Sequence, residues 1–197
     1  VVMCFFPIGG KLVDNFAARY VTMFGLAVFA FGAALLSGTD VNTAFWILAF
    51  FVVIGRLGQS IMLPAINVSA LKALPLEQLN NGSGSINFVR LMGGAFGVNT
   101  LVVFMEQRTE FHAISLTATQ TAGNASSREL LDMVSSLLHG GGVPDAVLQP
   151  GALHYLGRVV EAQAQTMGFQ DGFMVIAVVF ILALIPAMML GREKGRR

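Results

Sequence analysis

Charged residues are scarce in this sequence. They make up 12% of its 197 residues, whereas hydrophobic residues make up 55%. An average soluble domain has about twice that share of charge, so these charges could not cover the surface of a soluble protein of this size. The apolar excess must face something other than water, and lipid is the obvious candidate. The sequence therefore predicts an integral membrane protein.

Several other features are absent. The single cysteine, Cys4, excludes an internal disulfide, and a net charge of +1 gives no reason to expect a nucleic-acid partner. No nucleophile–base pair, metal-ligand cluster or phosphate-binding loop is visible, so we expect neither an enzyme nor a bound cofactor or metal. The three histidines have no metal-ligand spacing; they are His112, His139 and His154. The chain also lacks an initiating Met and a signal peptide, and we expect it to be part of a longer protein.

Four apolar stretches are long enough to cross about 30 Å of hydrocarbon as helices. They are residues 20–36, 43–66, 87–105 and 172–190, and residues 1–8 look like the end of a fifth span. The alternative, buried helices of a large soluble protein, is disfavoured because all four stretches are uncharged or nearly so. We expect an all-α membrane protein with three parts: spans with short connectors (1–105), a long segment (106–171), and a last span with a basic tail (172–197).

Basic residues alternate along the chain in a way that predicts its orientation. Lys11 and Arg19 lie in one connector, Lys72 lies in the next but one, and four more lie in the tail at 191–197. The intervening turn has Asp40 and no Lys or Arg. The positive-inside rule then makes the C-terminus cytoplasmic and puts residues 106–171 outside.

The long segment 106–171 contains helical patterns of its own. Ser126, Ser127 and Glu129 resemble a helix start, apolar residues follow on one face, and glycines at 140–142 end the pattern. A second pattern starts after Pro150. We expect two short amphipathic helices on the membrane surface or on the helical bundle. A partly disordered loop is the alternative.

Polar side chains inside spans are costly and usually face a protein interior or a water-filled cavity. Arg56 and Gln59 lie well inside the second span, three residues apart and therefore on one face. Asn87 and Arg90 have the same spacing in the first turn of the third span. For Arg56 we expect a hydrogen-bonding or cavity role. For Arg90, reaching to the cytoplasmic headgroups is an equally good alternative.

Small residues predict close helix contacts in the third span. Gly93 and Gly97 form a Gly-x-x-x-Gly spacing with Gly94 beside them, which allows two backbones to approach. Pro64 makes a kink plausible in the second span. No span has an Asp or Glu in its interior. A proton-driven transporter needs such a group, so its proton site would lie outside these residues.

The connector that starts at Gly10 resembles the cytoplasmic G-x-L-x-D…R loop of the major facilitator superfamily, through Gly10, Asp14 and Arg19. Asn15 and Ala17 depart from the family's basic residue and glycine. These departures fit the weaker copy in the C-terminal half. The resemblance implies that Gly10, Asp14 and Arg19 form a gating loop between two spans.

A second resemblance covers nearly the whole chain. Residues 55–59, 74–77, 93–97 and 161–164 look like the late spans of EmrB/QacA-type drug exporters, together with Pro64, Ser83, Asn87, Arg90, Phe169, Asp171 and Phe173. The resemblance implies the C-terminal portion of a fourteen-span drug:proton antiporter in the bacterial inner membrane. The implied partners are the lipid bilayer, the missing N-terminal half and a hydrophobic small-molecule substrate. In many Gram-negative members, a periplasmic adaptor and an outer-membrane channel are further partners.

Two functions therefore stand at the level of sequence. The first is the C-terminal portion of a multidrug exporter, and the second is a stand-alone membrane scaffold or interaction protein without transport activity. Upstream sequence encoding further spans favours the first, and a start codon near Val1 favours the second.

Overall fold

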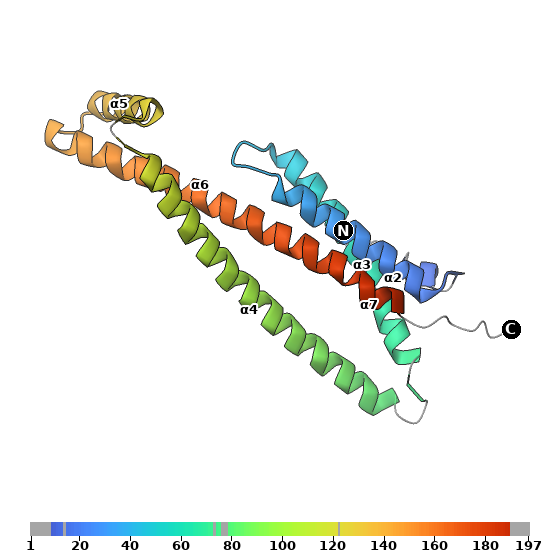
Figure 1. Cartoon of the computed structure of the whole chain (residues 1–197). Coiled ribbons are helices and arrows are strands. Elements are labelled where there is room, and N and C mark those ends of the chain that lie inside the picture. The colour runs from blue at the N-terminus through green and yellow to red at the C-terminus, as the bar shows by residue number, and fades with distance from the viewer. Residues whose placement is uncertain (1–8, 14, 73, 76–78, 122, 190–197) are drawn as a thin grey trace. The chain divides into compact units, whose positions relative to one another are not determined.

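The computed structural model describes residues 9–13, 15–72, 74–75, 79–121 and 123–189 (Figure 1). The predicted fifth-span remnant at 1–8, Asp14, part of the connector at 76–78 and the basic tail at 191–197 lie outside the described residues. Within the described ranges the regular structure is helical, with no strand. The helices are α2 (Ala18–Ser37), α3 (Phe45–Lys72), α4 (Leu79–Thr119), α5 (Ala125–Gly140), α6 (Asp145–Leu182) and α7 (Leu184–Met189).

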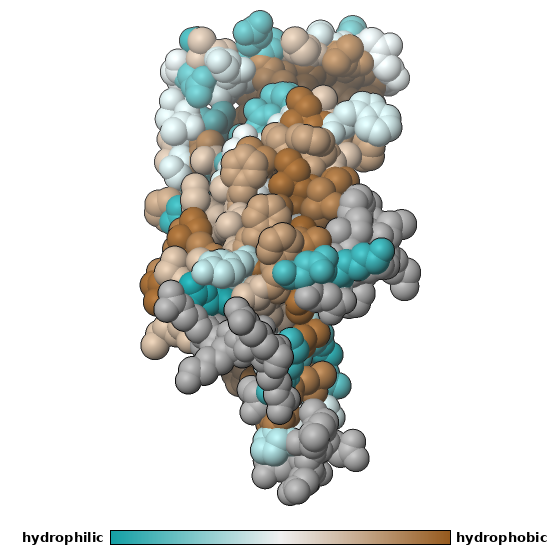
Figure 2. Space-filling model, turned by 90° about the vertical axis from the view of Figure 1, so that its right-hand side faces the viewer, coloured by the Kyte–Doolittle hydropathy of each residue, from teal (hydrophilic) through white to brown (hydrophobic). Residues whose placement is uncertain are grey.

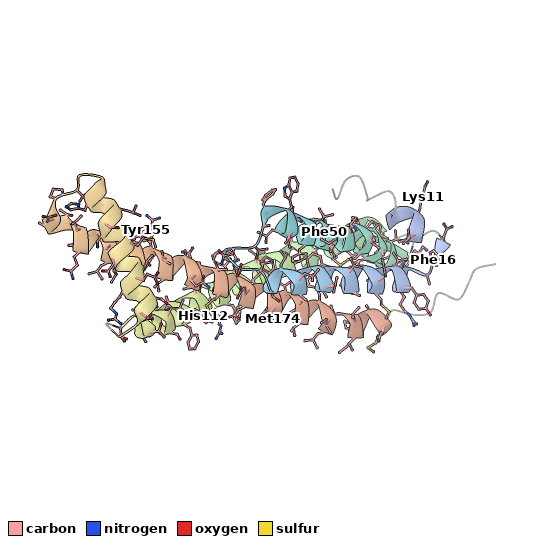
Figure 3. All side chains as sticks on the ribbon, turned by 90° about the horizontal axis from the view of Figure 1, so that it is seen from above. Lys11, Phe16, Phe50, His112, Tyr155 and Met174 are labelled. Atoms are coloured by element: carbon pink, nitrogen blue, oxygen red, sulfur yellow. The ribbon has the colours of Figure 1, made fainter. Side chains whose placement is uncertain are left out.

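The four predicted spans are confirmed. The helices long and apolar enough to cross a membrane are Ala18–Ser37, Phe45–Lys72, Gly82–Thr119 and Asp145–Met189. Brown, apolar side chains cover much of the middle of the face shown in Figure 2. Phe16, Phe50 and Met174, labelled in Figure 3, are 63%, 62% and 53% exposed. Large apolar side chains left open to this extent are suited to a lipid environment. The protein is an all-α, multi-pass membrane protein.

Two helix boundaries differ from the prediction. The helix that contains the third span does not end at residue 105, because α4 continues to Thr119. The pattern after Pro150 is not a separate short helix, because α6 runs without interruption from Asp145 to Leu182, with Pro150 inside it. Hydropathy reports where apolar residues stop, and a helix can continue beyond that point. Glu106, Gln107 and Arg108 end the apolar run, but all three are good helix formers.

Helix α5 confirms one predicted short amphipathic helix, with a corrected start. Its N-cap is Asn124, whose side chain accepts a hydrogen bond from the backbone N–H of Ser127. The Ser126–Ser127 pair therefore lies inside the first turn. An Asn cap satisfies one of the backbone donors that a helix start leaves free. The helix ends at Gly140 with Gly141 as its C-cap, and Gly142 has a φ of 80°, a conformation that glycine adopts without strain.

The chain divides into two compact units. One comprises Val1–Val102 with Gln170–Arg197, and the other is Val103–Phe169. In the first unit, α2 and α3 pack antiparallel over two small clusters, one with Val21 and Ala65 and the other with Leu26 and Met62. The turn between these helices is fixed by the side chain of Gln170, whose Nε2 donates to the carbonyl of Thr39 at 2.6 Å.

The unit Val103–Phe169 has its own contacts. Ser127 is buried, and its hydroxyl donates to Oε1 of Gln120. A Cβ at Gly151 would lie 3.0 Å from Leu138, so α5 packs against the start of α6. His139 and Asp145 face each other at 3.8 Å across the α5–α6 turn, with both side chains exposed.

Candidate functional site

Glycines allow α2 and α3 to pack backbone against backbone. A Cβ at Gly58 would lie 2.5 Å from the backbone nitrogen of Phe29 and 2.8 Å from the carbonyl oxygen of Gly25. A Cβ at Gly32 would lie 2.7 Å from the backbone nitrogen of Gly55. Real Cβ atoms do not come this close, so any larger residue would push the helices apart. The pair α2–α3 is therefore a closely fitted element.

Beside this contact lies a recess of about 270 Å³. It is lined by residues of α2, α3 and α6, namely Phe29, Gly32, Ala33, Leu36, Val52, Gly55, Arg56, Gln59, Phe173 and Ile176. The walls are mainly aliphatic and aromatic. The exceptions are Arg56 and Gln59, both predicted from the sequence to share a face inside a span. The ring of Phe29 also contacts that of Phe180, with centroids 4.3 Å apart, which fixes one wall.

The structure brings Arg56 and Gln59 into contact. Nη1 of Arg56 donates to Oε1 of Gln59 at 2.8 Å, so their predicted common face is confirmed. The amide oxygen holds one edge of the guanidinium. Because an arginine carries five N–H donors, this contact leaves donors for a further partner. Arg56 is exposed in this chain, so such a partner can reach it.

The second predicted pair is also in contact. Arg90 donates to Oδ1 of Asn87. Both residues line a recess of about 330 Å³ with Asn67, Leu71, Ser83 and Ile86, between the end of α3 and the start of α4. One correction concerns their place in the helix. Because α4 begins at Leu79, Asn87 and Arg90 lie beyond its second turn and not in its first.

The predicted gating loop is described only in part. Residues 9–13 are helical, and Arg19 lies in the first turn of α2, not in a connector. The guanidinium of Arg19 lies 4.8 Å from the centre of the Tyr20 ring and donates to its hydroxyl oxygen at 3.3 Å. Among the described residues, no atom comes within 4 Å of a Cβ built at Gly10. Asp14 lies outside the described residues, so its role stays a prediction.

The three predicted packing glycines of α4 have open space beside them in the part of the chain that the structure describes. A Cβ at Gly93, Gly94 or Gly97 would meet nothing within 4 Å. The helix-packing role assigned to them stays a prediction, and it needs a partner beyond these residues. Pro64, in contrast, is buried within α3, which continues through it as one helix.

Sequence reasoning missed the glycines that make contacts in this chain. Gly9 is buried, and its Cβ would lie 2.6 Å from the carbonyl of Ser60. Gly25 and Gly32 share a seven-residue spacing, which places them on one face of α2. This spacing was the available signal. Among the described residues, no group of three His, Cys, Asp or Glu side chains is placed to hold a metal ion.

The sequence was compared with known protein families, curated proteins and solved structures. No family model matches the sequence, and no solved structure matches it. The chain is 25% identical over 194 residues to the colistin resistance protein EmrB of Acinetobacter baumannii, covering 98% of this chain and 37% of that protein. It is 22% identical to the uncharacterized MFS-type transporter YhcA of Bacillus subtilis, over 96% of this chain and 36% of that protein. A shorter match, 29% identical over 52% of this chain and 19% of the relative, is to the multidrug transporter protein MdtP of Bacillus subtilis.

These matches are to membrane transport proteins. Along most of its length the chain is similar to EmrB and to MFS-type transporters, as the residues compared in the sequence indicated. It spans a little over a third of the length of the first two curated relatives that it matches.

Proposed function

We propose that this chain is the C-terminal part of a fourteen-span secondary transporter that exports hydrophobic or amphipathic compounds in exchange for protons. The observation that carries the proposal is a similarity to EmrB-like transporters along 98% of the chain, one of them named for drug resistance. The apolar recess beside Arg56 supports it, because ligand sites are concave and mostly apolar with a few polar groups.

In this transporter we assign different roles to the α2–α3 pair and to α4. The tightly fitted α2–α3 pair moves as one body. The open glycine face of α4 packs against the remaining part of the transporter and changes that contact as access alternates. The apolar runs at 20–36, 43–66, 87–105 and 172–190 hold no acid, so we place the proton-binding residue in the rest of the protein. Gly10, Asp14 and Arg19 act as the gating loop. We assign the chain no enzymatic role.

The proposed setting is the bacterial inner membrane, with the C-terminus in the cytoplasm. The alternation of basic residues supports this orientation. In this orientation residues 106–171 lie in the periplasm, where an adaptor protein leading to an outer-membrane channel would bind. Reporter fusions after Arg197 and at Gly141 test the orientation. They should report opposite sides of the membrane, and a signal from the same side for both contradicts it.

Reconstitution tests the transport function. The full-length protein that carries this sequence is placed in vesicles with an imposed pH gradient and offered a hydrophobic dye. We expect uphill dye movement that collapses when the gradient is removed, and proton flux that depends on the dye. A scaffold protein would give neither signal, even when correctly inserted.

A further inference from the structure

Arg56 lies far from either end of its helix. It follows Phe45 by about three helical turns, or about 16 Å, and precedes Lys72 by more than four turns. We take Trp46, near the start of α3, as the level of the membrane interface, because Trp is enriched there. Since the hydrocarbon core is about 30 Å thick, Arg56 lies near the middle of the membrane.

A charge at this depth needs a partner. An arginine keeps its positive charge, and placing that charge at the centre of a span costs several kcal/mol. Among the described residues, Gln59 is the hydrogen-bond partner of Arg56, and no carboxylate pairs with it. An amide offers a dipole but no negative charge. The guanidinium therefore lacks an anion within this part of the protein.

The space beside Arg56 has the shape and chemistry of a small binding site. The rings of Phe29 and Phe173 are among its walls. Gly32 and Gly55 keep its floor free of side chains, and a Cβ at Gly55 would meet no atom within 4 Å. Its volume of about 270 Å³ lies just below the usual range for small-molecule pockets, which is about 300–1,000 Å³. This size suits part of a small molecule.

We propose that this recess binds amphipathic compounds that carry an anionic group such as a carboxylate. The guanidinium of Arg56, oriented by Gln59, pairs with the anion, and the apolar body packs against Phe29 and Phe173. The inference rests on the proposed export function and adds the charge class of the substrate. Arg56 then makes the site selective for an anion over a neutral compound of the same shape.

A lipid headgroup is a poorer occupant than a small molecule. Lipid phosphates lie at the membrane surface, about 16 Å along the helix axis from Arg56, and an arginine side chain does not cover that distance. An amphipathic anion in the transport pathway can enter at mid-membrane depth, because the walls of the recess accept its apolar part. Depth and charge together favour the small molecule.

Binding of two matched probes to the purified full-length protein tests the proposal. Dansylglycine carries a carboxylate, and dansylglycinamide is the same fluorophore without the charge. We expect the wild-type protein to bind dansylglycine at least tenfold more tightly. Arg56→Gln should remove this preference while changing the affinity for the amide less than twofold. Arg56→Lys, which keeps the charge without the planar fork, should retain part of it.

Two further variants separate a binding role from a structural one. Gly55→Val should fill the recess without meeting another helix, and it should weaken the binding of both probes. Arg158→Gln removes the same charge from an exposed residue of the other unit, and it should leave the preference intact. Thermal unfolding of each variant verifies that the fold is retained.

Several results would overturn the inference. They are an absence of preference in the wild type, a preference that survives Arg56→Gln, and an equal loss of both probes in that variant. A preference seen in phosphatidylcholine vesicles but lost when phosphatidylglycerol is added would identify a lipid as the occupant. Gradient-driven export of a neutral dye in the same vesicles is measured separately. If export persists without charge selectivity, only the inference fails; if export is absent, the proposed function fails.

Discussion

Glycines lie in close helix contacts in the α2–α3 pair, whereas the glycines at 93–97 of α4 face open space. In the pair, a Cβ at Gly25, Gly32 or Gly58 would lie within 2.8 Å of a neighbouring atom. On α4, a Cβ at Gly93 or Gly97 would meet nothing within 4 Å, and its most apolar stretch has no buried residue within this chain. A glycine cluster permits close helix contact without showing where the partner lies. Each helix of the pair has its partner among the described residues, and the packing role predicted for the α4 glycines requires a partner beyond them.

The largest expected effect is at the open glycines of α4. We predict that Gly97→Leu in the full-length transporter abolishes export while leaving membrane insertion normal. The physical reason is that packing is a main force between helices in lipid, and a leucine would hold α4 away from its partner. Efflux assays at matched membrane abundance measure the effect.

Arg90→Lys is the companion variant, because Arg90 lies two turns from Gly97 on the same helix. If Arg90 only reaches to headgroups, lysine replaces it and export is retained. If the contact of Arg90 with Asn87 is required, Arg90→Lys will lose export, because lysine lacks the planar set of N–H donors that arginine offers. Normal export by Gly97→Leu combined with lost export by Arg90→Lys would reverse the two roles.

A second prediction concerns the contact inside the α2–α3 pair. Gly58→Ala should lower the free energy of unfolding of the transporter by about 2 kcal/mol, because the new methyl would meet the backbone of Phe29 and of Gly25. Gly55→Ala is the matched control, three residues earlier on α3, and should be close to neutral for stability since its Cβ meets nothing. Denaturant titration in mixed micelles compares them. Equal losses for both variants would contradict the backbone contact.

A third prediction uses two adjacent glycines near the N-terminal end of the described chain. Gly9→Ala should destabilise the protein by about 1–2 kcal/mol, because its Cβ would lie 2.6 Å from the carbonyl oxygen of Ser60. Gly10→Ala should not, since its Cβ has open space. If Gly10 belongs to the gating loop, Gly10→Ala will slow export at unchanged stability. Loss of stability in Gly10→Ala but not in Gly9→Ala would exchange their roles.

The sequence predicted the spans well because a membrane-spanning helix is determined by a simple quantity, the length of an apolar run. All four spans are confirmed. It also predicted the common face of Arg56 and Gln59, whose side chains are in contact, since a three-residue spacing fixes a common face on any helix. These features depend on local sequence alone.

Other features depend on which helix lies opposite, and the sequence could not provide that. Gly97 and Gly58 look alike in an apolar run, yet only Gly58 has a neighbour in the described part of this chain. The ends of α4 and α6 were also missed, because the apolar signal stops at Glu106 while helical hydrogen bonding continues through residues that favour helix. Hydropathy therefore located the spans but not the full helices.

The smallest expected effect is at Gly168. Its surroundings are intermediate between the closely opposed glycines of α2–α3 and the open glycines of α4. A Cβ there would overlap Oγ1 of Thr109 and lie 3.1 Å from the carbonyl oxygen of Met105, so α6 packs against the outer part of α4. The closest atom belongs to a side chain that can rotate, unlike the backbone atoms that oppose Gly58. We predict that Gly168→Ala costs about 1 kcal/mol and that Thr109→Ala in the same protein restores most of it. A double-mutant cycle from denaturant titrations measures the coupling between the two positions. Additive losses would mean that Thr109 gives no relief and that the carbonyl of Met105 sets the limit, which would place Gly168 with the closely fitted glycines of α2 and α3.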